Sequence, residues 1–167
     1  MDPMKMALLI VDMQLAYLGD CVKESGAEAA CEYINYVSEK FRAKGQCVVH
    51  VKHVDPGESK EDLGCEIIPQ VKIGPEDHTV WKSFNNAFWQ TGLEELLRRE
   101  KVDLVIVSGF SAEYCVTFTY GGGTERGFKT VMLQKGIVSK NPLVVPEVTR
   151  DRNMISYPAI DAILEAQ

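Results

Sequence analysis

The stretch that decides the fold is "VDLVIVSGFSAEYC", from Val102 to Cys115. It begins with an apolar run that does not alternate with polar residues, and it ends in a turn that carries a cysteine. A non-alternating apolar run of this length is typical of a strand that is buried on both faces of a parallel sheet. The stretch therefore predicts an α/β fold. It also raises the question whether Cys115 is a buried structural thiol or the nucleophile of an enzyme.

Three further apolar runs predict strands of the same kind. They are "MALLIVD" from Met6, "CVVHV" from Cys47 and "KTVML" from Lys129. Shorter extended pieces, "HTVWKS" and "MISY", follow the second and the last of these runs. Helical patterns separate the strands, over 25–45, over about 91–100 and after Ser111.

This alternation of strands and helices predicts a three-layer α/β/α architecture. Its centre would be a doubly wound, mainly parallel sheet of five or six strands. We expect residues 1–167 to form one domain, because the length is close to that of an average domain. Residues 53–79 are rich in Gly, Pro, Asp and Glu, which predicts a long surface loop that rims a site.

Composition excludes several classes of function. The chain is 46% hydrophobic and 25% charged, with a net charge of −6 and no run of basic residues. Nucleic acid and anionic membranes are therefore not expected as partners. The apolar run Met6–Val11 is too short for a signal peptide or a membrane span. The five cysteines form no C-x-x-C pair, so we expect reduced thiols in a cytoplasmic protein.

Three polar residues fall where strands should deliver them to one edge of the sheet. Asp12 ends the first strand, Lys82 ends the short piece "HTVWKS", and Cys115 follows the strand that begins at Val102. Each residue alone also has a structural explanation. Asp12 could cap a loop or helix, Lys82 could be a solvated cation, and Cys115 could be a small core residue. Together they predict a site, because the carboxyl ends of parallel strands share one edge.

The three side chains could together perform nucleophilic catalysis. A thiol needs a base or a nearby positive charge to become a nucleophile, and Lys82 and a helix N-terminus would supply positive charge to Cys115. Asp12 could take the thiol proton and return it to a leaving amine. The turn "GFSAEYC" would direct backbone N–H groups at a developing oxyanion.

Three blocks of the chain resemble the isochorismatase-like cysteine hydrolase superfamily. They are "LLIVDMQ", "VWKSFNNAFWQTGLEELLRREKVDLVIVSGFSAEYCV" and "TERGFKTVML". That superfamily contains isochorismatases, nicotinamidases, N-carbamoylsarcosine and ureidoacrylate amidohydrolases, and biuret hydrolases. The resemblance implies that Asp12, Lys82 and Cys115 are a catalytic triad, and that the Phe110–Ser111 peptide bond is cis. It also implies an oxyanion hole from the amides of Ser111 and Cys115, and assembly as a homo-oligomer, a dimer or tetramer.

The chain departs from the metal-binding members of that superfamily. Nicotinamidases carry D-x-H after the second strand, where this chain has His53 and Asp55 in the order H-x-D. His50 and His53 differ by an odd number, so on a strand their side chains face opposite ways and cannot bind one ion together. We therefore expect neither a metal nor another cofactor, which counts against a nicotinamidase.

A second departure is the run Gly121-Gly122-Gly123, in the helix expected after Cys115. Each glycine costs about 1 kcal/mol relative to alanine inside a helix. Either the helix ends early, at Tyr120, or the glycines allow close backbone packing against a second subunit. Of these alternatives, we expect the helix to end early.

Aromatic residues near the predicted site suggest the kind of substrate. Tyr17, Phe84 and Phe110 could pack against a small planar molecule, and Gln14 could bind a carbonyl or hold Asp12. No arginine is placed to bind a carboxylate, so a dianion such as isochorismate is not favoured. A small neutral or singly charged amide or carbamoyl compound fits better.

The sequence thus predicts a metal-independent cysteine hydrolase that cleaves a C–N bond through a thioester. Two alternatives stay open. One is hydrolysis of a vinyl ether of the isochorismatase type, in which the aspartate protonates the substrate and the cysteine is dispensable. The other is a non-catalytic paralogue that only binds a small molecule.

Overall fold

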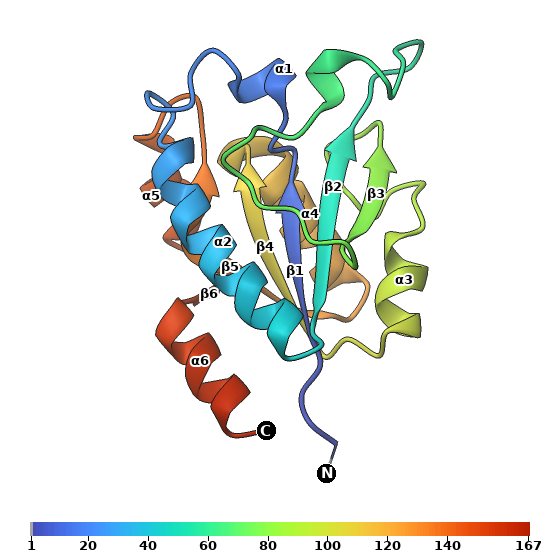
Figure 1. The fold of residues 1–167 in the computed structure, drawn as a ribbon, viewed down its shortest axis with the longest axis vertical. Helices are drawn as coiled ribbons and strands as arrows, with labels where there is room; N and C mark the ends of the chain where they lie inside the picture. Colours follow the sequence, from blue (N-terminus) through green and yellow to red (C-terminus); the bar gives the residue numbers. More distant parts are fainter. Residues whose placement is uncertain (1) are drawn as a thin grey trace.

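A sheet of six strands forms the centre of the computed structural model, which describes residues 2–167 (Figure 1). The strands are β1 (Met6–Val11), β2 (Cys47–His53), β3 (His78–Lys82), β4 (Leu104–Phe110), β5 (Lys129–Val138) and β6 (Met154–Ile155). Their order is β3-β2-β1-β4-β5-β6, and every neighbouring pair is parallel. The prediction of a doubly wound α/β fold is confirmed.

Helices cover both faces of the sheet, and short helical turns connect the elements. The helices are α1 (Leu15–Leu18), α2 (Ala27–Ala43), α3 (Leu93–Arg99), α4 (Thr117–Glu125), α5 (Val144–Thr149) and α6 (Tyr157–Glu165). The turns are the 3₁₀ turn η1 (Leu63–Cys65) and the π-helical turn η2 (Ala112–Val116). Among residues 2–167, no helix has the length and apolar character needed to cross a bilayer.

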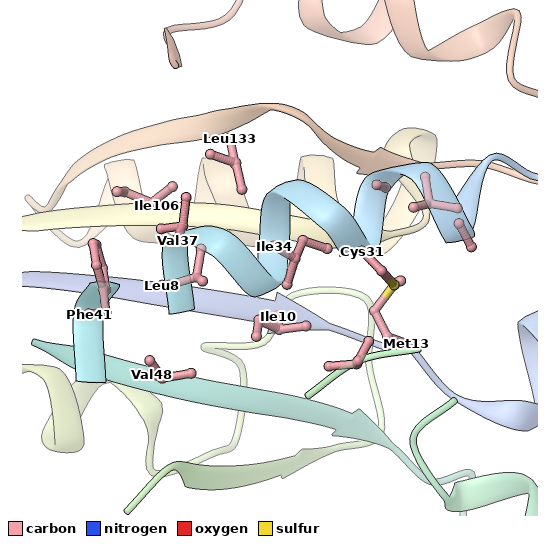
Figure 2. Close-up of a cluster of buried hydrophobic side chains, with 14 of the residues drawn as sticks. Leu8, Ile10, Met13, Cys31, Ile34, Val37, Phe41, Val48, Ile106 and Leu133 are labelled. Carbon is pink, nitrogen blue, oxygen red and sulfur yellow. The ribbon is translucent and has the colours of Figure 1, made fainter. Parts of the chain in front are cut away.

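The strand β1 supplies both halves of the core, because alternate side chains of a strand point to opposite faces. Leu8 and Ile10 contribute to a cluster on the face that α2 and α6 cover (Figure 2). Leu9 and Val11 contribute to a second cluster on the face that α3 and α4 cover. Since both faces are apolar, the strand reads as an unbroken hydrophobic run. Fully burying each of these side chains contributes roughly 1.5–3 kcal/mol.

The helix α2 forms because its apolar residues recur at helical spacing. Ile34, Val37 and Phe41 are fully buried against the sheet, and the opposite side of the helix is exposed. The helix ends before Gly45, which has a φ of 63° and so occupies the left-handed region that favours glycine. Replacing Phe41 by Ala would leave a cavity that costs about 3–5 kcal/mol.

The helix α4 does not end at Tyr120, as the sequence suggested, but continues through Gly121-Gly122-Gly123 to Glu125. A Cβ at Gly122 would overlap the side-chain amide of Asn86, and one at Gly123 would come within 2.8 Å of Thr130 Oγ1. Close packing inside the chain therefore requires these two glycines and outweighs their low helix propensity. Gly121 has open space beside it.

The segment between β2 and β3 is only partly a surface loop. Ile68 and Val71 are buried in the core beside α2. The end of the segment is held at Asp77, whose carboxylate accepts two hydrogen bonds from Arg42 of α2 and one from His50 of β2. These contacts hold the segment as it runs from the carboxyl ends of the strands back to their amino ends, where β3 begins (Figure 1).

The parallel sheet brings functional residues to the carboxyl edge, which is at the top of Figure 1. Asp12 follows β1, and His53, Lys82 and Phe110 are the last residues of β2, β3 and β4. The strand order reverses between β1 and β4, and ligands bind beside such a switch point in open α/β sheets.

Candidate active site

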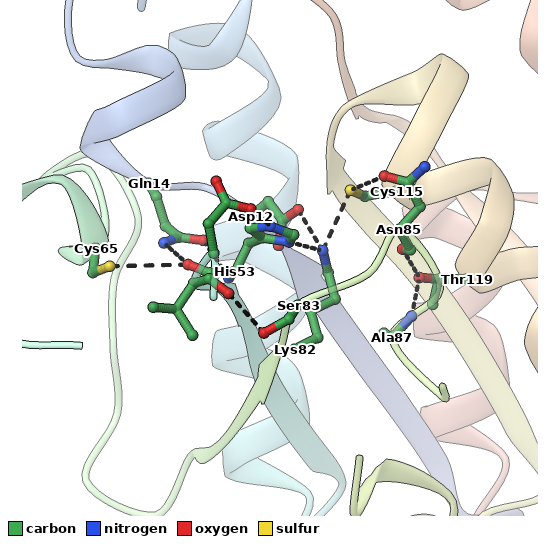
Figure 3. Close-up of polar contacts among 12 residues, drawn as sticks. Asp12, Gln14, His53, Cys65, Lys82, Ser83, Asn85, Ala87, Cys115 and Thr119 are labelled. Atoms are coloured by element: carbon green, nitrogen blue, oxygen red, sulfur yellow. Dashed lines mark hydrogen bonds and ion pairs between the residues drawn. The ribbon is translucent and has the colours of Figure 1, made fainter. Parts of the chain in front are cut away.

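Lys82 is the centre of the polar cluster at this edge (Figure 3). Its Nζ lies 2.9 Å from Asp12 Oδ2 and 2.9 Å from His53 Nδ1. Its third neighbour is Cys115 Sγ, at 3.3 Å. An ammonium group has three protons to donate, so these contacts use all of them. The structure therefore brings together Asp12, Lys82 and Cys115, and it adds His53.

Asp12 is held in an uncommon backbone conformation. Its φ is 49°, and its backbone N–H donates to Val51 O at 2.9 Å on the neighbouring strand β2. The side chain is buried, and Oδ2 accepts from Lys82. Among residues 2–167, nothing donates a hydrogen bond to the other oxygen, Oδ1. That oxygen is available to accept a proton.

His53 links the cluster to the rim of the site. Because Lys82 donates to Nδ1, the ring proton of the neutral imidazole lies on Nε2, which donates to Asp55 Oδ1 at 2.9 Å. His53 and Lys82 are partners in the register of β2 and β3. Sequence reasoning considered His53 only as a metal ligand. Its strand-end position was the available signal for a role beside Lys82.

Cys115 lies in the turn η2 and is half-buried. Burial and the negative charge of Asp12 raise the pKa of its thiol to about 12, although Lys82 acts in the opposite direction. The sequence led us to expect positive charge at this thiol, from Lys82 and a helix N-terminus. In the structure, desolvation outweighs that charge, so the resting thiol keeps its proton at neutral pH.

Asn85 is a further neighbour of the sulfur that sequence reasoning did not identify. Its Oδ1 lies 3.6 Å from Cys115 Sγ. Thr119 of α4 holds the segment around Asn85, because its hydroxyl accepts from Ala87 N at 3.0 Å and donates to Asn85 O at 3.5 Å. The absence of a side chain at Gly122 lets the same segment approach α4 closely. The helix thus positions Asn85 at the thiol.

The backbone before Cys115 has the predicted geometry. The Phe110–Ser111 peptide bond is cis, which confirms the expectation. Ser111 is buried, and its carbonyl accepts from Tyr114 N and Val116 N at 3.1 Å each. Gly109, with a φ of 102°, packs against the backbone of Val11, where a Cβ would overlap it.

A cavity of about 320 Å³ opens beside the sulfur. It is lined by Asp12, Tyr17, His53, Asn85, Phe110, Ser111, Glu113, Tyr114, Cys115 and Lys140. The rings of Tyr17 and Phe110 stack with their centroids 5.7 Å apart. Burial, with the charge of Asp12, raises the pKa of Tyr17, so its hydroxyl remains a hydrogen-bond donor. The volume and the aromatic wall suit a small molecule.

Two residues that the sequence suggested for substrate contact do not line this cavity. The amide of Gln14 is buried and holds the backbone of His53, donating to its carbonyl at 2.9 Å and accepting from its N–H at 2.7 Å. Gln14 thus fixes the end of β2. Phe84 is 47% exposed and borders a separate hollow with Trp81 and Ser83.

The described part of the chain, residues 2–167, holds no group of three His, Cys, Asp or Glu side chains that could share a metal ion. Both ring nitrogens of His53 are engaged, with Lys82 and Asp55. Neither ring nitrogen of His53 is therefore free to bind an ion.

Comparisons with known proteins identify the family. A family model described as "Isochorismatase domain" matches residues 6–147. Streptothricin hydrolase from Streptomyces noursei is 33% identical over 135 residues, which make up 75% of this chain and 47% of that protein.

Two solved structures share the fold. An isochorismatase-like hydrolase from Alkaliphilus metalliredigens superimposes with a TM-score of 0.87 at 20% identity, covering 96% of this chain and 97% of the other. N-carbamoylsarcosine amidase from Thermoplasma acidophilum superimposes with a TM-score of 0.77 at 25% identity. The match covers 92% of this chain and 95% of the amidase. Because the family match extends over most of the sequence, the chain belongs to the isochorismatase family of hydrolases.

Proposed function

We propose that this chain is a cysteine hydrolase that cleaves the C–N bond of a small amide or carbamoyl compound through a thioester. The observation that carries the proposal is the convergence of a carboxylate, an ammonium group and a thiol beside one cavity: Asp12 and Cys115 line it, and the buried Lys82 donates a hydrogen bond to each of them. The similarity to an amidase of known structure supports an amide as the substrate class.

In the first step, the sulfur of Cys115 attacks the carbonyl carbon and the thiol proton moves to Asp12. The raised thiol pKa means that this proton must be removed during the attack. Oδ1 of Asp12 is the suitable acceptor, because Oδ2 is already bonded to Lys82. Lys82, bonded to both Asp12 Oδ2 and Cys115 Sγ, faces the negative charge as it passes from the carboxylate through the sulfur to the carbonyl oxygen.

The carbonyl electron pair moves to oxygen and forms a tetrahedral oxyanion. The backbone amides of Ser111 and Cys115 are the donors that we assign to it, and preorganised donors of this kind are usually the largest catalytic contribution. The intermediate collapses when the C–N bond breaks. Asp12 then gives its proton to the leaving nitrogen, so ammonia or an amine departs and a thioester remains on Cys115.

Water completes the cycle. Asp12, again a carboxylate, takes a proton from water while the oxygen attacks the thioester carbon. The second oxyanion collapses with cleavage of the C–S bond, and the proton on Asp12 returns to the sulfur. The products are a carboxylic or carbamic acid and the resting thiol.

The same cluster favours a reaction without a metal and disfavours isochorismate as the substrate. His53 already binds Lys82 and Asp55 through its two ring nitrogens, so it has none left for an ion. Across residues 2–167, no arginine lines the cavity, and the charge of Lys140 in its wall is opposed by that of Glu113. A dianion would find no bidentate cationic partner there.

The test is direct observation of the thioester. The protein is mixed with a panel of small amides and carbamoyl compounds, quenched in acid and weighed by mass spectrometry, with peptide mapping of the adduct. We expect an acyl group on Cys115 and release of ammonia or amine. Cys115→Ala should lose both, whereas Cys21→Ala, at the other half-buried cysteine of residues 2–167, should lose neither. Turnover of an amide that persists in Cys115→Ala contradicts the mechanism, and hydrolysis of isochorismate by that variant would favour the vinyl ether reaction.

A further inference from the structure

Glu113 lies in the wall of the cavity that contains Cys115 and takes no part in the chemistry above. It is the second residue of the turn η2, two positions before the cysteine. Its Oε2 is buried and accepts no hydrogen bond from any residue between 2 and 167. The wall of the cavity therefore includes a glutamate with one carboxylate oxygen that is buried and has no donor among residues 2–167.

An arrangement of this kind calls for a donor from elsewhere. Buried polar atoms in folded proteins nearly always have a partner, because an unpaired one costs about 1–3 kcal/mol and a charged one costs more. Lys140 also lines the cavity, but it is exposed and forms no ion pair with Glu113. Within the described residues, Glu113 has no cation as a partner.

The charges around the cavity indicate what the missing donor is. The charges of Asp12 and Lys82 compensate each other, since their atoms lie 2.9 Å apart and both side chains are buried. Of the two carboxylates that line the cavity, Glu113 is therefore the one without a cation partner among residues 2–167. A protonated amine gives both the hydrogen bond and the opposite charge, and such charge-assisted bonds are the strong ones.

We propose that Glu113 binds a protonated amino group of the substrate, so that the substrate class is a small amide that also carries an amine. This assignment rests on the proposed function, because it takes the scissile amide to lie at Cys115. The stacked rings of Tyr17 and Phe110 pack against the methylene groups between amine and amide. Glu113 thus selects substrates that carry an amine, and Cys115 is the nucleophile that attacks the amide.

Binding to the Cys115→Ala variant tests the assignment without any dependence on turnover. Three amides that share the same two-methylene spacer are titrated by calorimetry or NMR. β-Alaninamide carries an ammonium group, butanamide has a methyl group at that position, and succinamate has a carboxylate. We expect affinities in that order, with β-alaninamide at least about tenfold tighter than butanamide.

Glu113→Gln is then added to the Cys115→Ala background, since it keeps the shape of the side chain and removes its charge. The preference for β-alaninamide should fall to within about twofold. The matched control is Glu147→Gln, at an exposed glutamate of α5 that pairs with Arg150, and it should keep the full preference.

Equal affinities for β-alaninamide and butanamide, including no detectable binding of either, overturn the assignment. A preference that persists in Glu113→Gln also overturns it. The two proposals fail separately, because an acyl adduct on Cys115 tests the cysteine mechanism whatever the role of Glu113. Selective binding without any acyl adduct would instead support Glu113 and contradict the mechanism.

Discussion

Lys82 Nζ lies 2.9 Å from Asp12 Oδ2 in a site where the two side chains are 0% and 2% exposed. Two charges removed from water in this way depend on each other, because each is stabilised mainly by its partner. The pair therefore matters for the stability of the fold as well as for the chemistry.

We predict that Lys82→Met lowers the free energy of unfolding by about 3–5 kcal/mol, because it leaves the Asp12 carboxylate buried without its cation. The double variant with Asp12→Asn should cost clearly less than the sum of the two single substitutions. Urea denaturation of the four proteins measures both effects. Additive costs would mean that the two charges are not coupled.

The second prediction concerns the protonation of Cys115. Burial and the charge of Asp12 raise the pKa of the thiol to about 12, and Lys82 lowers it. The ultraviolet absorbance of the thiolate, taken as the difference between wild type and Cys115→Ala, should therefore be absent at neutral pH. Asp12→Asn should move its appearance to lower pH, and Lys82→Met should move it to higher pH. A thiolate signal in the wild type near pH 7 would show that the ion pair with Lys82 dominates instead.

The third prediction separates two neighbouring glycines of α4. A Cβ at Gly122 would overlap the side chain of Asn86, whose Oδ1 accepts from Phe88 N at 2.9 Å, whereas Gly121 has open space. We expect Gly122→Ala to destabilise by about 1–3 kcal/mol and to reduce turnover, because the segment that carries Asn85 must shift. Gly121→Ala is the matched control and should stabilise by roughly 0.5–1 kcal/mol. Thermal unfolding and activity measure the difference; equal effects would contradict the packing argument.

The parts of the fold that follow from burial could be predicted from the sequence. The unbroken apolar run of β1 is typical of a strand covered on both faces, and a parallel sheet then delivers Asp12 and Lys82 to the same edge. Cys115 follows from the same reasoning. These predictions need only the pattern of side chains and the geometry of parallel strands.

The parts that depend on register and local packing could not be predicted. His53 meets Lys82 because β2 and β3 pair in one particular register, which no short pattern defines. Glu113 lies in the π-helical turn η2, which places it in the cavity wall, and its burial depends on the elements around it. The continuation of α4 through its glycines could not be predicted either. At Gly122, close packing against Asn86 outweighs the low helix propensity of glycine.

The last prediction concerns a buried histidine that does not line the cavity of Cys115. His50 Nε2 lies 2.8 Å from Asp77 Oδ2, and its Nδ1 is buried with no partner among residues 2–167. Burial lowers the pKa of His50 below its usual value of 6.5, against the opposing effect of the Asp77 carboxylate. The unfolded chain therefore binds a proton more readily than the folded chain does. The stability from neutral His50 is fully present above about pH 6.5 and is lost as the pH falls below that value.

Removal of His50 should therefore flatten the acid side of the stability profile. Below about pH 6.5, the free energy of unfolding of the wild type should fall with an added slope of up to about 1.4 kcal/mol per pH unit. His50→Gln can still donate to Asp77 but cannot take up a proton, so its slope should be smaller although its stability at neutral pH is lower. His78→Gln, which also removes one imidazole, leaves the buried pair intact and should keep the steep slope. Urea denaturation across this pH range measures all three proteins. An unchanged slope in His50→Gln would mean that another group, and not the buried histidine, controls the loss of stability in acid.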